Sequence, residues 1–218
     1  MPKITGIAIV TVGVALILSA LLLLCRNRQE DLQAGLEAES LLESIEAAIE
    51  TKKTPAPTAD QQPEATPSAP PLVPEMPVVL LDGYEYIGCV EIPVQGLKLP
   101  VMAQWDYDRL KLAPCRQFGS SRTDDLVIAA HNYDSHFGRL KDLSAGDPVL
   151  FTDMEGVVSA YCVEKIETLS PNEVDAVQNS GYDLVLYTCT KGGALRVTAF
   201  CNRKAASAPS PAPTQMEK

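Results

Sequence analysis

Residues 184–200 read "LVLYTCTKGGALRVTAF". An apolar run, Leu184–Cys189, precedes two glycines, and a second apolar run, Leu195–Arg203, follows them. Gly-Gly is a strong signal for a tight hairpin, because both central positions of a type I′ turn require a positive φ. The stretch therefore predicts two antiparallel β-strands joined by a short turn.

The predicted hairpin places a thiol beside a guanidinium. With Gly192 and Gly193 as the loop, counting outward sets Cys189 directly opposite Arg196. Opposed residues on one face of a sheet have Cβ atoms about 4.5–5.5 Å apart. A guanidinium at that range favours a thiolate or a developing oxyanion. A slip of one residue would put the two side chains on opposite faces. On the residues alone, a buried structural thiol is the alternative.

A nucleophilic thiol needs a base, and the chain has only two histidines. His131 ends the apolar run "LVIAAH", so it closes a predicted strand as Cys189 does. His136 lies in the polar loop "NYDSHFG" and is expected to be solvated or to line a groove. Two strand ends that meet at one rim of a barrel allow Cys–His nucleophilic catalysis. A structural cysteine and a satisfied histidine form the competing interpretation.

Strand signals fill the region before this hairpin, and helical signals are few. Short apolar runs bounded by turn residues indicate strands, and "MEG" at 154–156 indicates a hairpin turn. Many strands with few helices in about 125 residues indicate a β-barrel or sandwich. The expected further strands are Tyr84–Ile92, Leu97–Ala103, Leu126–His131, Pro148–Asp153 and Val157–Thr168, and the expected short helices are Tyr107–Leu112, Phe137–Leu143 and Pro171–Val177.

The N-terminal segment Ile4–Leu24 contains 21 residues without a charge. About 20 apolar residues cross a bilayer as a helix, and a buried soluble helix is seldom apolar on every side over this length. A cleaved signal peptide is the main alternative, but no small-x-small cleavage site follows Leu24. The segment predicts an uncleaved transmembrane anchor. Charges flank it on both sides, so the positive-inside rule assigns no orientation.

Composition divides the remaining chain. Helical spacing predicts a juxtamembrane helix after the anchor, and a solvated acidic helix without a partner is the alternative to one that pairs. The eight prolines of 54–77 predict an extended linker, long enough to hold the next domain several nanometres from the membrane. The apolar positions of that helix are Leu32, Leu36, Leu42, Ile45 and Ile49. The predicted divisions are 1–28, the cytoplasmic end and anchor; 29–53, an acidic juxtamembrane helix; 54–77, the linker; 78–204, the folded domain; and 205–218, a polar tail.

Charge and cysteine usage exclude other classes of function. The net charge of −10 argues against a broad nucleic-acid-binding surface, which needs basic residues. No cysteine spacing resembles a zinc site. Four cysteines, Cys89, Cys115, Cys162 and Cys201, are candidates for disulfides, and Cys162 and Cys201 could pair because both lie in long strands; buried free thiols are the alternative. Trp105 is predicted to be a core residue, and Arg122 and Arg203 surface charges.

Three segments resemble one family. "LVLYTC" followed by an arginine on the next strand resembles the signature of the sortases, the membrane-anchored cysteine transpeptidases of Gram-positive bacteria. "AAHNYDSHFGRLKDLSAGDPV" at 129–149 resembles the segment around their essential histidine, and "YIGCVEIPVQGLKLPVM" at 86–102 is similar to their opening strands. The three motifs occur in the family's order and extend over Tyr84–Arg203.

The resemblance implies a mainly β fold, a closed sortase-type barrel of about 7–8 strands with a few short helices after a transmembrane helix. It implies Cys189 as the nucleophile, His131 as the general acid–base and Arg196 as the group that binds the substrate backbone and stabilises the oxyanion. The residues implied as substrate or oxyanion support are Thr188, Thr190 and Asn132; the alternative for Asn132 is a turn cap. No metal or other cofactor is implied; some sortases use calcium, but no acidic cluster here is diagnostic of it.

The function implied is cleavage of the C-terminal sorting signal of secreted proteins, an LPxTG-like peptide, and transfer of the acyl group to an amine of peptidoglycan or lipid II. The alternatives are a cysteine peptidase that only hydrolyses its peptide and a non-catalytic surface-binding barrel. A sortase works outside the membrane, so a single-pass protein with a cytoplasmic N-terminus and an extracellular catalytic domain is expected, without nucleic-acid partners.

The sequence also departs from the family pattern. The gap between Cys189 and Arg196 is short, Val185-Leu186 replaces the usual Thr-Leu, and Ala130 replaces the usual glycine before the histidine. Pilus-assembling members carry an aromatic-acidic lid before the domain and a second membrane span after it, where this chain has a Pro-rich linker and a polar tail. The resemblance therefore favours a class B- or D-like sortase that anchors individual proteins over a pilus-forming class C enzyme.

Overall fold

The computed structural model describes residues 2–53 and 75–204. The proposed linker and C-terminal tail fall almost entirely outside these residues. The elements are α1 (Pro2–Lys53), β1 (Val79–Leu81), β2 (Tyr84–Ile92), η1 (Pro93–Gln95), β3 (Leu97–Met102), α2 (Arg109–Leu112), β4 (Cys115–Phe118), β5 (Leu126–Ala130), η2 (Leu140–Asp142), β6 (Pro148–Asp153), β7 (Val158–Leu169), α3 (Asp175–Gln178), β8 (Leu184–Cys189) and β9 (Arg196–Arg203).

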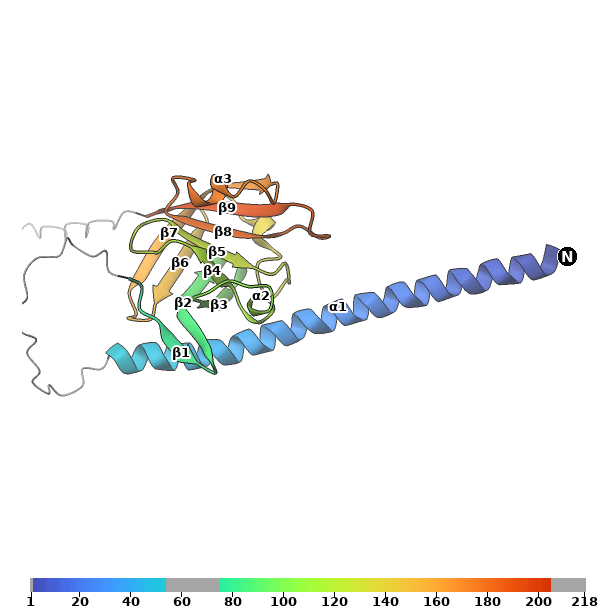
Figure 1. Cartoon of the computed structure of the whole chain (residues 1–218), viewed down its shortest axis with the longest axis horizontal. Coiled ribbons are helices and arrows are strands. Elements are labelled where there is room, and N and C mark those ends of the chain that lie inside the picture. Colours follow the sequence, from blue (N-terminus) through green and yellow to red (C-terminus); the bar gives the residue numbers. More distant parts are fainter. Residues whose placement is uncertain (1, 54–74, 205–218) are drawn as a thin grey trace, which may run out of the picture.

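The strands form a closed barrel (Figure 1). Their order is β1-β2-β3-β4-β5-β8-β9-β7-β6, and pairing of β2 with β6 closes eight of them into a ring that leaves β1 outside. β5 pairs with β8 and β3 with β4 in parallel, and the other pairings are antiparallel. The expected closed barrel is therefore confirmed. Aliphatic side chains on alternate strand positions fill its interior, as the period of two requires.

Two strands were absent from the sequence-based expectation. β1 has only three residues, and β4 has four with an irregular register against β5. Strands this short carry too little alternation to be separated from loops. The expected helices shrink to the four-residue α2 and α3 and the 3-10 turn η2.

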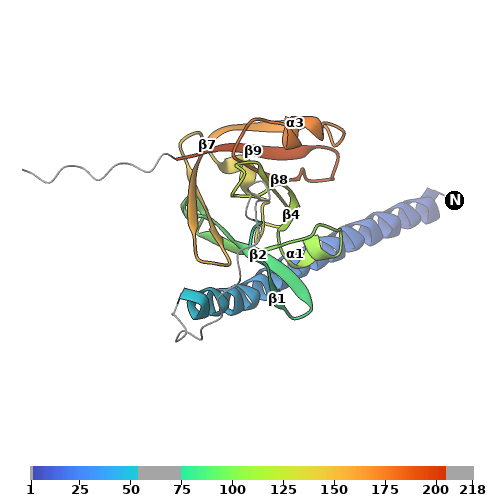
Figure 2. The same ribbon diagram turned by 60° about the vertical axis from the view of Figure 1, so that its left-hand side comes forward.

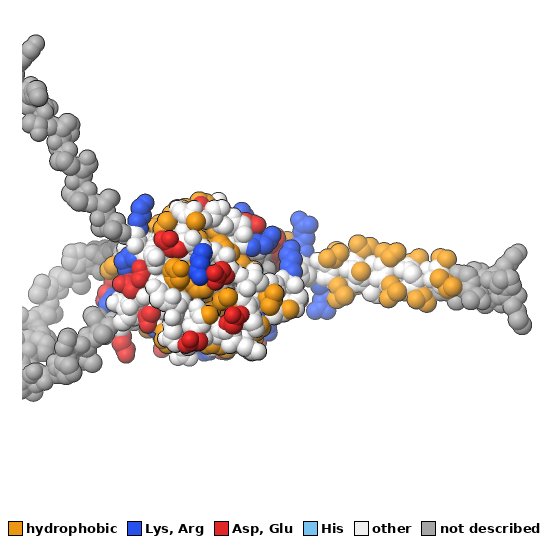
Figure 3. All heavy atoms as spheres, turned by 90° about the horizontal axis from the view of Figure 1, so that it is seen from above, with side chains coloured by type: hydrophobic (Ala, Val, Ile, Leu, Met, Phe, Trp, Pro, Cys, Tyr) orange, Lys and Arg blue, Asp and Glu red, His pale blue; other side chains and the backbone are white. Residues whose placement is uncertain are grey.

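The predicted anchor and the predicted juxtamembrane helix form one uninterrupted helix of 52 residues. Its N-terminal half extends away from the barrel, and its C-terminal half lies along the barrel wall (Figures 1 and 2). α1 is long and apolar enough to span a membrane, and none of its most apolar window is buried against the protein. Figure 3 shows apolar side chains along the projecting half and Lys and Arg side chains where α1 meets the barrel.

α1 packs on the barrel through one face of the helix. Ala34, Ala38, Ile45 and Ile49 are buried there at helical spacing, whereas Leu32 and Leu36 are exposed. Small side chains allow the helix backbone to approach the barrel closely, so alanines rather than leucines occupy the interface.

The docked helix also changes the expected distance between domain and membrane. Ile45 and Ile49 pack in a cluster with Tyr86, Met102 and Met154 of the barrel, and Lys98 forms an ion pair with Glu46. The barrel therefore lies directly against the helix that continues from the apolar span. This arrangement differs from the expectation that the linker holds the domain several nanometres from the membrane, because Ile45 and Ile49 of the helix pack directly on the barrel.

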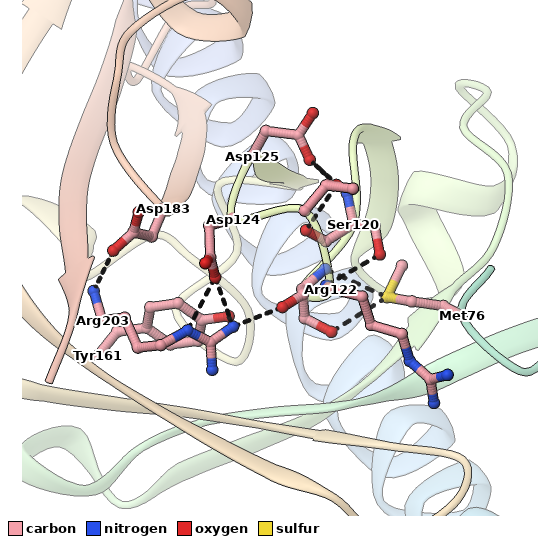
Figure 4. Close-up of polar contacts among 10 residues, drawn as sticks. Met76, Ser120, Arg122, Asp124, Asp125, Tyr161, Asp183 and Arg203 are labelled. Carbon is pink, nitrogen blue, oxygen red and sulfur yellow. Dashed lines mark hydrogen bonds and ion pairs between the residues drawn. The ribbon is translucent and has the colours of Figure 1, made fainter. Parts of the chain in front are cut away.

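A polar network holds the barrel end where β8 begins and β9 ends (Figure 4). Arg203 donates from its backbone N–H to Asp183 (2.6 Å) and from Nε to Asp124 (2.8 Å), and its guanidinium lies over the Tyr161 ring. Arg122 pairs with the buried Asp153 at 3.0 Å. Arg203 is exposed, as expected of a surface charge, whereas Arg122 is half-buried. The network fixes the end of β8 opposite to Cys189.

Candidate active site

Two neighbouring parallel strands end side by side and bring the candidate nucleophile and base to one rim. In the register of β5 against β8, Ala130 pairs with Thr188, so the next residues, His131 and Cys189, follow at the same edge. The Thr188 hydroxyl donates a hydrogen bond to Ala130 O (2.9 Å) inside the protein. The expected meeting of two strand ends is therefore confirmed at the level of the backbone.

The side chains of these residues leave the sheet on its outer face. In β8, Leu184 and Leu186 point into the barrel core, while Val185 and Tyr187 belong to a cluster outside the barrel. Successive strand residues alternate between faces, so Cys189 continues the outer series. By the same alternation in β5, Ala129 lines an outer cavity and His131 follows it.

The β8–β9 hairpin sets the arginine opposite the cysteine. Cys189 pairs directly with Arg196, which confirms the predicted register, and both residues line the same cavity. The turn itself differs from the predicted two-residue loop. Gly193 N–H donates to Thr190 O (2.8 Å), and Gly192 and Gly193 have φ angles of 94° and 77°. The two glycines thus occupy the last two positions of a four-residue turn, where their positive φ is needed.

Thr190 and Arg196 both interact with the hairpin backbone. Thr190 N–H donates to Leu195 O (2.9 Å), and Leu195 N–H donates to the Thr190 hydroxyl oxygen (3.1 Å). Arg196 Nη1 donates to the carbonyls of Gly193 (3.0 Å) and Leu195 (3.1 Å). The half-buried guanidinium therefore lies folded over the hairpin, at the edge of the cavity that holds Cys189.

His131 is held by its own loop. Its ring stacks on Tyr133 with centroids 4.0 Å apart and planes 8° from parallel. Its Nδ1 accepts from Asn132 N–H at 3.1 Å, and Asn132 Nδ2 donates to Thr190 O at 3.2 Å, which ties the two strand ends together. Tyr133 was not predicted, because an aromatic residue two positions after a histidine carries no signal of its own.

Burial is the main influence on the His131 imidazole and lowers its pKa below 6.5. The side-chain oxygen of Asn132, 3.1 Å from Nδ1, and the charge of Glu30 oppose this shift, while the charge of Lys111 adds to it. A lowered pKa leaves the ring neutral at physiological pH, in the form that accepts a proton.

A cavity of about 220 Å³ lies over the outer face beside Cys189. Its walls come from the segment after β3 and from the connection between β7 and β8 that carries α3. Trp105 lines it with 39% of its surface exposed, so the expectation of a core residue is wrong. The segment after β3 leaves the barrel, and Trp105 contacts the exposed Tyr107 there, with centroids 5.2 Å apart. His131 is not among the lining residues.

His136 does not lie in a solvated loop. It is fully buried, and burial lowers its pKa to about 4. The expectation that it is a solvated or groove residue is wrong, because α1 covers the loop that carries it. All six cysteines are free thiols. Within residues 2–53 and 75–204, no group of three His, Cys, Asp or Glu side chains is arranged to hold a metal ion.

The chain is similar to known proteins in its sequence and in its fold. The sortase domain model matches residues 90–204. Sortase C from Clostridium perfringens SM101 is 23% identical, with 56% of this chain and 71% of that chain covered and a TM-score of 0.46. Streptococcus pneumoniae sortase C is 27% identical, with 57% and 72% of the two chains covered and a TM-score of 0.49. A Clostridium perfringens sortase D5 transpeptidase is 20% identical, with 55% and 79% covered and a TM-score of 0.49. No curated protein matches the chain. The class B- or D-like assignment stays a prediction.

The matched segment contains β3 to β9, both strand ends described above and the hairpin between β8 and β9. It makes up more than half of the chain. The chain therefore belongs to the sortase family and is a cysteine transpeptidase that anchors or links surface proteins.

Proposed function

We propose that Cys189 is the nucleophile, His131 the general acid–base and Arg196 the oxyanion-stabilising group of this transpeptidase. The observation that carries the proposal is their common placement at one rim of the sheet. His131 and Cys189 follow at the ends of two parallel strands, and Arg196 is the hairpin partner of Cys189. Thr188 and Asn132 act as positioning residues, because their hydrogen bonds join β5 to β8 and to the hairpin. Thr190 fixes the hairpin itself.

Acylation begins when the neutral His131 imidazole takes the proton of the Cys189 thiol, and the resulting thiolate attacks the carbonyl carbon of the scissile peptide bond. A C–S bond forms as the oxygen takes negative charge, which the Arg196 guanidinium stabilises after it turns from the hairpin carbonyls to the substrate. The C–N bond then breaks, and the His131 imidazolium gives its proton to the leaving amine. The products are a thioester and a released peptide amine.

Transfer reverses these roles. An incoming amine attacks the thioester carbon, neutral His131 takes a proton from the attacking nitrogen, and the Cys189 thiolate leaves. A new amide bond replaces the thioester, so the reaction needs no external energy source. The lowered pKa of His131 fits this step, because the ring must be neutral to accept the proton.

The cavity supports a substrate with apolar side chains ahead of the scissile bond. Trp105, Val174, Val177 and Tyr187 line it beside Cys189. An LPxTG-like sorting signal presents such side chains next to a Thr-Gly bond, so this peptide class is the proposed donor. The amine of peptidoglycan or its lipid-linked precursor is the proposed acceptor. The proposed location is the outer side of the cell membrane, with the N-terminus in the cytoplasm.

Hydrolysis of the peptide without transfer is the second candidate function, and the reaction products distinguish hydrolysis from transpeptidation. The full chain in micelles is incubated with an acyl-donor peptide library, with and without a glycine-based amine, and the products are analysed by mass spectrometry. We expect an amide with the added amine that disappears in Cys189→Ala and His131→Ala. Free carboxylic acid as the only product, at every amine concentration, would establish a peptidase instead.

A further inference from the structure

The membrane-anchoring helix contacts the loop that carries His131, outside the cavity already described. Asp31 of α1 accepts hydrogen bonds from Ser135 N–H (3.0 Å) and the Ser135 hydroxyl (2.6 Å) with Oδ1, and from Asp134 N–H (3.2 Å) with Oδ2. Asp31 and Ser135 are 104 positions apart in the chain. One carboxylate thus binds two consecutive backbone N–H groups and a hydroxyl at the tip of the loop.

Hydrogen bonds within the loop 131–138 connect its tip to its base, so a contact at the tip also constrains the residues near His131. Phe137 N–H donates to His131 O (3.2 Å), and the N–H groups of His136 and Gly138 donate to Tyr133 O (2.9 and 2.8 Å). A Cβ atom at Gly138 would lie 2.7 Å from Tyr133 O, which no side chain tolerates. The hydrogen bonds fix the backbone of Tyr133, whose ring stacks on the imidazole of His131.

The helix approaches this loop closely because its residues there are small. Ala34 is 4% exposed, and a Cβ atom at Gly35 would lie 3.1 Å from Ser135 Cβ. This distance is shorter than an ordinary van der Waals contact, so a Cβ at position 35 requires Ser135 to shift by a few tenths of an ångström. The close approach and the Asp31 hydrogen bonds act on the same serine.

Charges on α1 support the same arrangement. Burial works to raise the pKa of Asp31, but the hydrogen bonds from Ser135 and Asp134 outweigh it and hold the pKa below its usual value. Asp31 is therefore ionised at neutral pH and accepts these bonds at full strength. The neighbouring Glu30 carries a negative charge that favours the protonated form of His131.

We propose that Asp31 is a positioning residue for the transpeptidase reaction: from the membrane-anchoring helix, through Ser135 and the loop 131–138, it holds Tyr133 against His131 and so orients the imidazole. The proposal rests on the assignment of His131 as the acid–base. Docking of α1 on the barrel is then required for full catalytic rate, and the membrane anchor does more than tether the enzyme.

The test compares variants of the full chain in micelles, with the donor peptide selected in the library assay and a glycine-based amine. Asp31→Ala removes the carboxylate, and Glu43→Ala removes an exposed carboxylate of the same helix as its control. Gly35→Ala inserts a Cβ against Ser135 while leaving every hydrogen-bonding group in place. Gly13→Ala is its matched control, because a Cβ there meets nothing within 4 Å.

We expect Asp31→Ala and Gly35→Ala to lower kcat about tenfold or more with little change in KM, and to shift the limb of the kcat–pH profile that reports His131. Asp31→Asn, which keeps one acceptor oxygen, should recover part of the rate. Circular dichroism confirms that each variant is folded at the assay temperature. Glu43→Ala and Gly13→Ala should match the unsubstituted chain in rate and profile.

Two results would overturn the proposal, and they are distinguishable. If Asp31→Ala and Gly35→Ala keep the rate and pH profile of their controls while His131→Ala is inactive, the positioning role is wrong and the acid–base assignment stands. If His131→Ala itself retains its rate, the acid–base assignment fails and the positioning role fails with it.

Discussion

Cys189 differs in its surroundings from Cys89, Cys115 and Cys201, the buried thiols of the barrel. It is half-buried and lines a cavity, whereas burial raises the pKa of Cys115 and of Cys201 to about 12 and also raises that of Cys89. A thiol with so high a pKa stays protonated and is a poor nucleophile. Only the surroundings separate these residues, since all are cysteines on strands.

His136 predicts a specific dependence of stability on pH. Its pKa is about 4 in the folded chain, because of burial, against 6.5 for the ordinary side chain. Between these values the unfolded chain binds a proton that the folded chain does not, so the free energy of unfolding falls as the pH falls through 6.5 and levels off below 4. The loss over this window is about 3 kcal/mol.

Urea titrations of the full chain in micelles, between pH 7.5 and 4, measure this loss. His136→Gln should remove most of the slope, while His131→Gln, at a half-buried position, should keep most of it. Asp31 contributes only at lower pH, because its pKa is lowered from 3.8. An unchanged slope in His136→Gln would show that another group is responsible.

At the scale of elements, the hairpin turn controls the register of Cys189 against Arg196. Gly192 has a φ of 94°, and a Cβ there meets nothing within 4 Å, so Gly192→Ala introduces backbone strain and no clash. We expect a cost of about 1–3 kcal/mol in stability or a relaxed turn, and an acylation rate reduced about tenfold through the displaced arginine.

Gly146→Ala is the matched control for this change. Gly146 has a φ of 97° and equally open surroundings, but it lies in the turn before β6, away from the rim. Stopped-flow measurement of acylation should show a loss for position 192 alone. Equal acylation rates in the two variants would contradict the role given to the hairpin register.

The docking of α1 predicts a difference between two apolar residues of the same helix. Ile45 is fully buried against the barrel, and Leu36 is 68% exposed. Ile45→Ala should lower the free energy of unfolding by about 2–5 kcal/mol through lost burial and a new cavity, whereas Leu36→Ala should change it by less than about 0.5 kcal/mol. Chemical denaturation followed by tryptophan fluorescence measures both; similar losses would mean that the helix docks through another face.

The hairpin and the helix show what the sequence could predict. Gly192 and Gly193 determine the register locally, so counting residues was enough to pair Cys189 with Arg196. The docking of α1 was not predicted, because the spacing of Ile45 and Ile49 indicated only a helix, and Ala34 and Ala38 have weak apolar signals. The contact of Asp31 with Ser135 depends on tertiary packing, and no spacing in the sequence encodes it.

At the scale of the whole molecule, α1 connects the apolar span directly to the candidate site. Asp31 lies seven residues after Leu24, and at 1.5 Å per residue this is about 10 Å along the helix. The β8–β9 hairpin projects toward the side from which α1 extends (Figures 1 and 2). The rim that carries Cys189 and His131 therefore faces the membrane when α1 spans it.

This orientation predicts how far two surface positions lie from the bilayer. Lys191 is in the hairpin turn, and Lys204 follows the far end of β9, which at about 3.3 Å per residue is some 25 Å away. Fluorophores attached at each position in proteoliposomes should transfer energy to a headgroup dye more efficiently from position 191. Equal transfer from the two positions would show that the barrel does not keep this orientation.

The sequence predicted some, but not all, of the segments that contribute to the candidate site. The three sortase-like motifs lie within the barrel, and local patterns marked the strand ends that present His131 and Cys189. The contribution of α1 was not predictable, because sequence divides the chain into anchor, helix, linker and domain, whereas packing joins the helix and the barrel into one body. The linker between them in sequence does not separate them in space.

The central claim is that Cys189 forms a thioester with the help of His131 and Arg196. The most direct measurement is intact-mass and peptide-mapping mass spectrometry of the full chain after rapid acid quench with the selected donor peptide. We predict one acyl adduct, on Cys189, that is absent in Cys189→Ala and accumulates at least tenfold more slowly in His131→Ala and Arg196→Ala. An adduct on another cysteine, or one that forms equally fast without His131 and Arg196, would contradict the account.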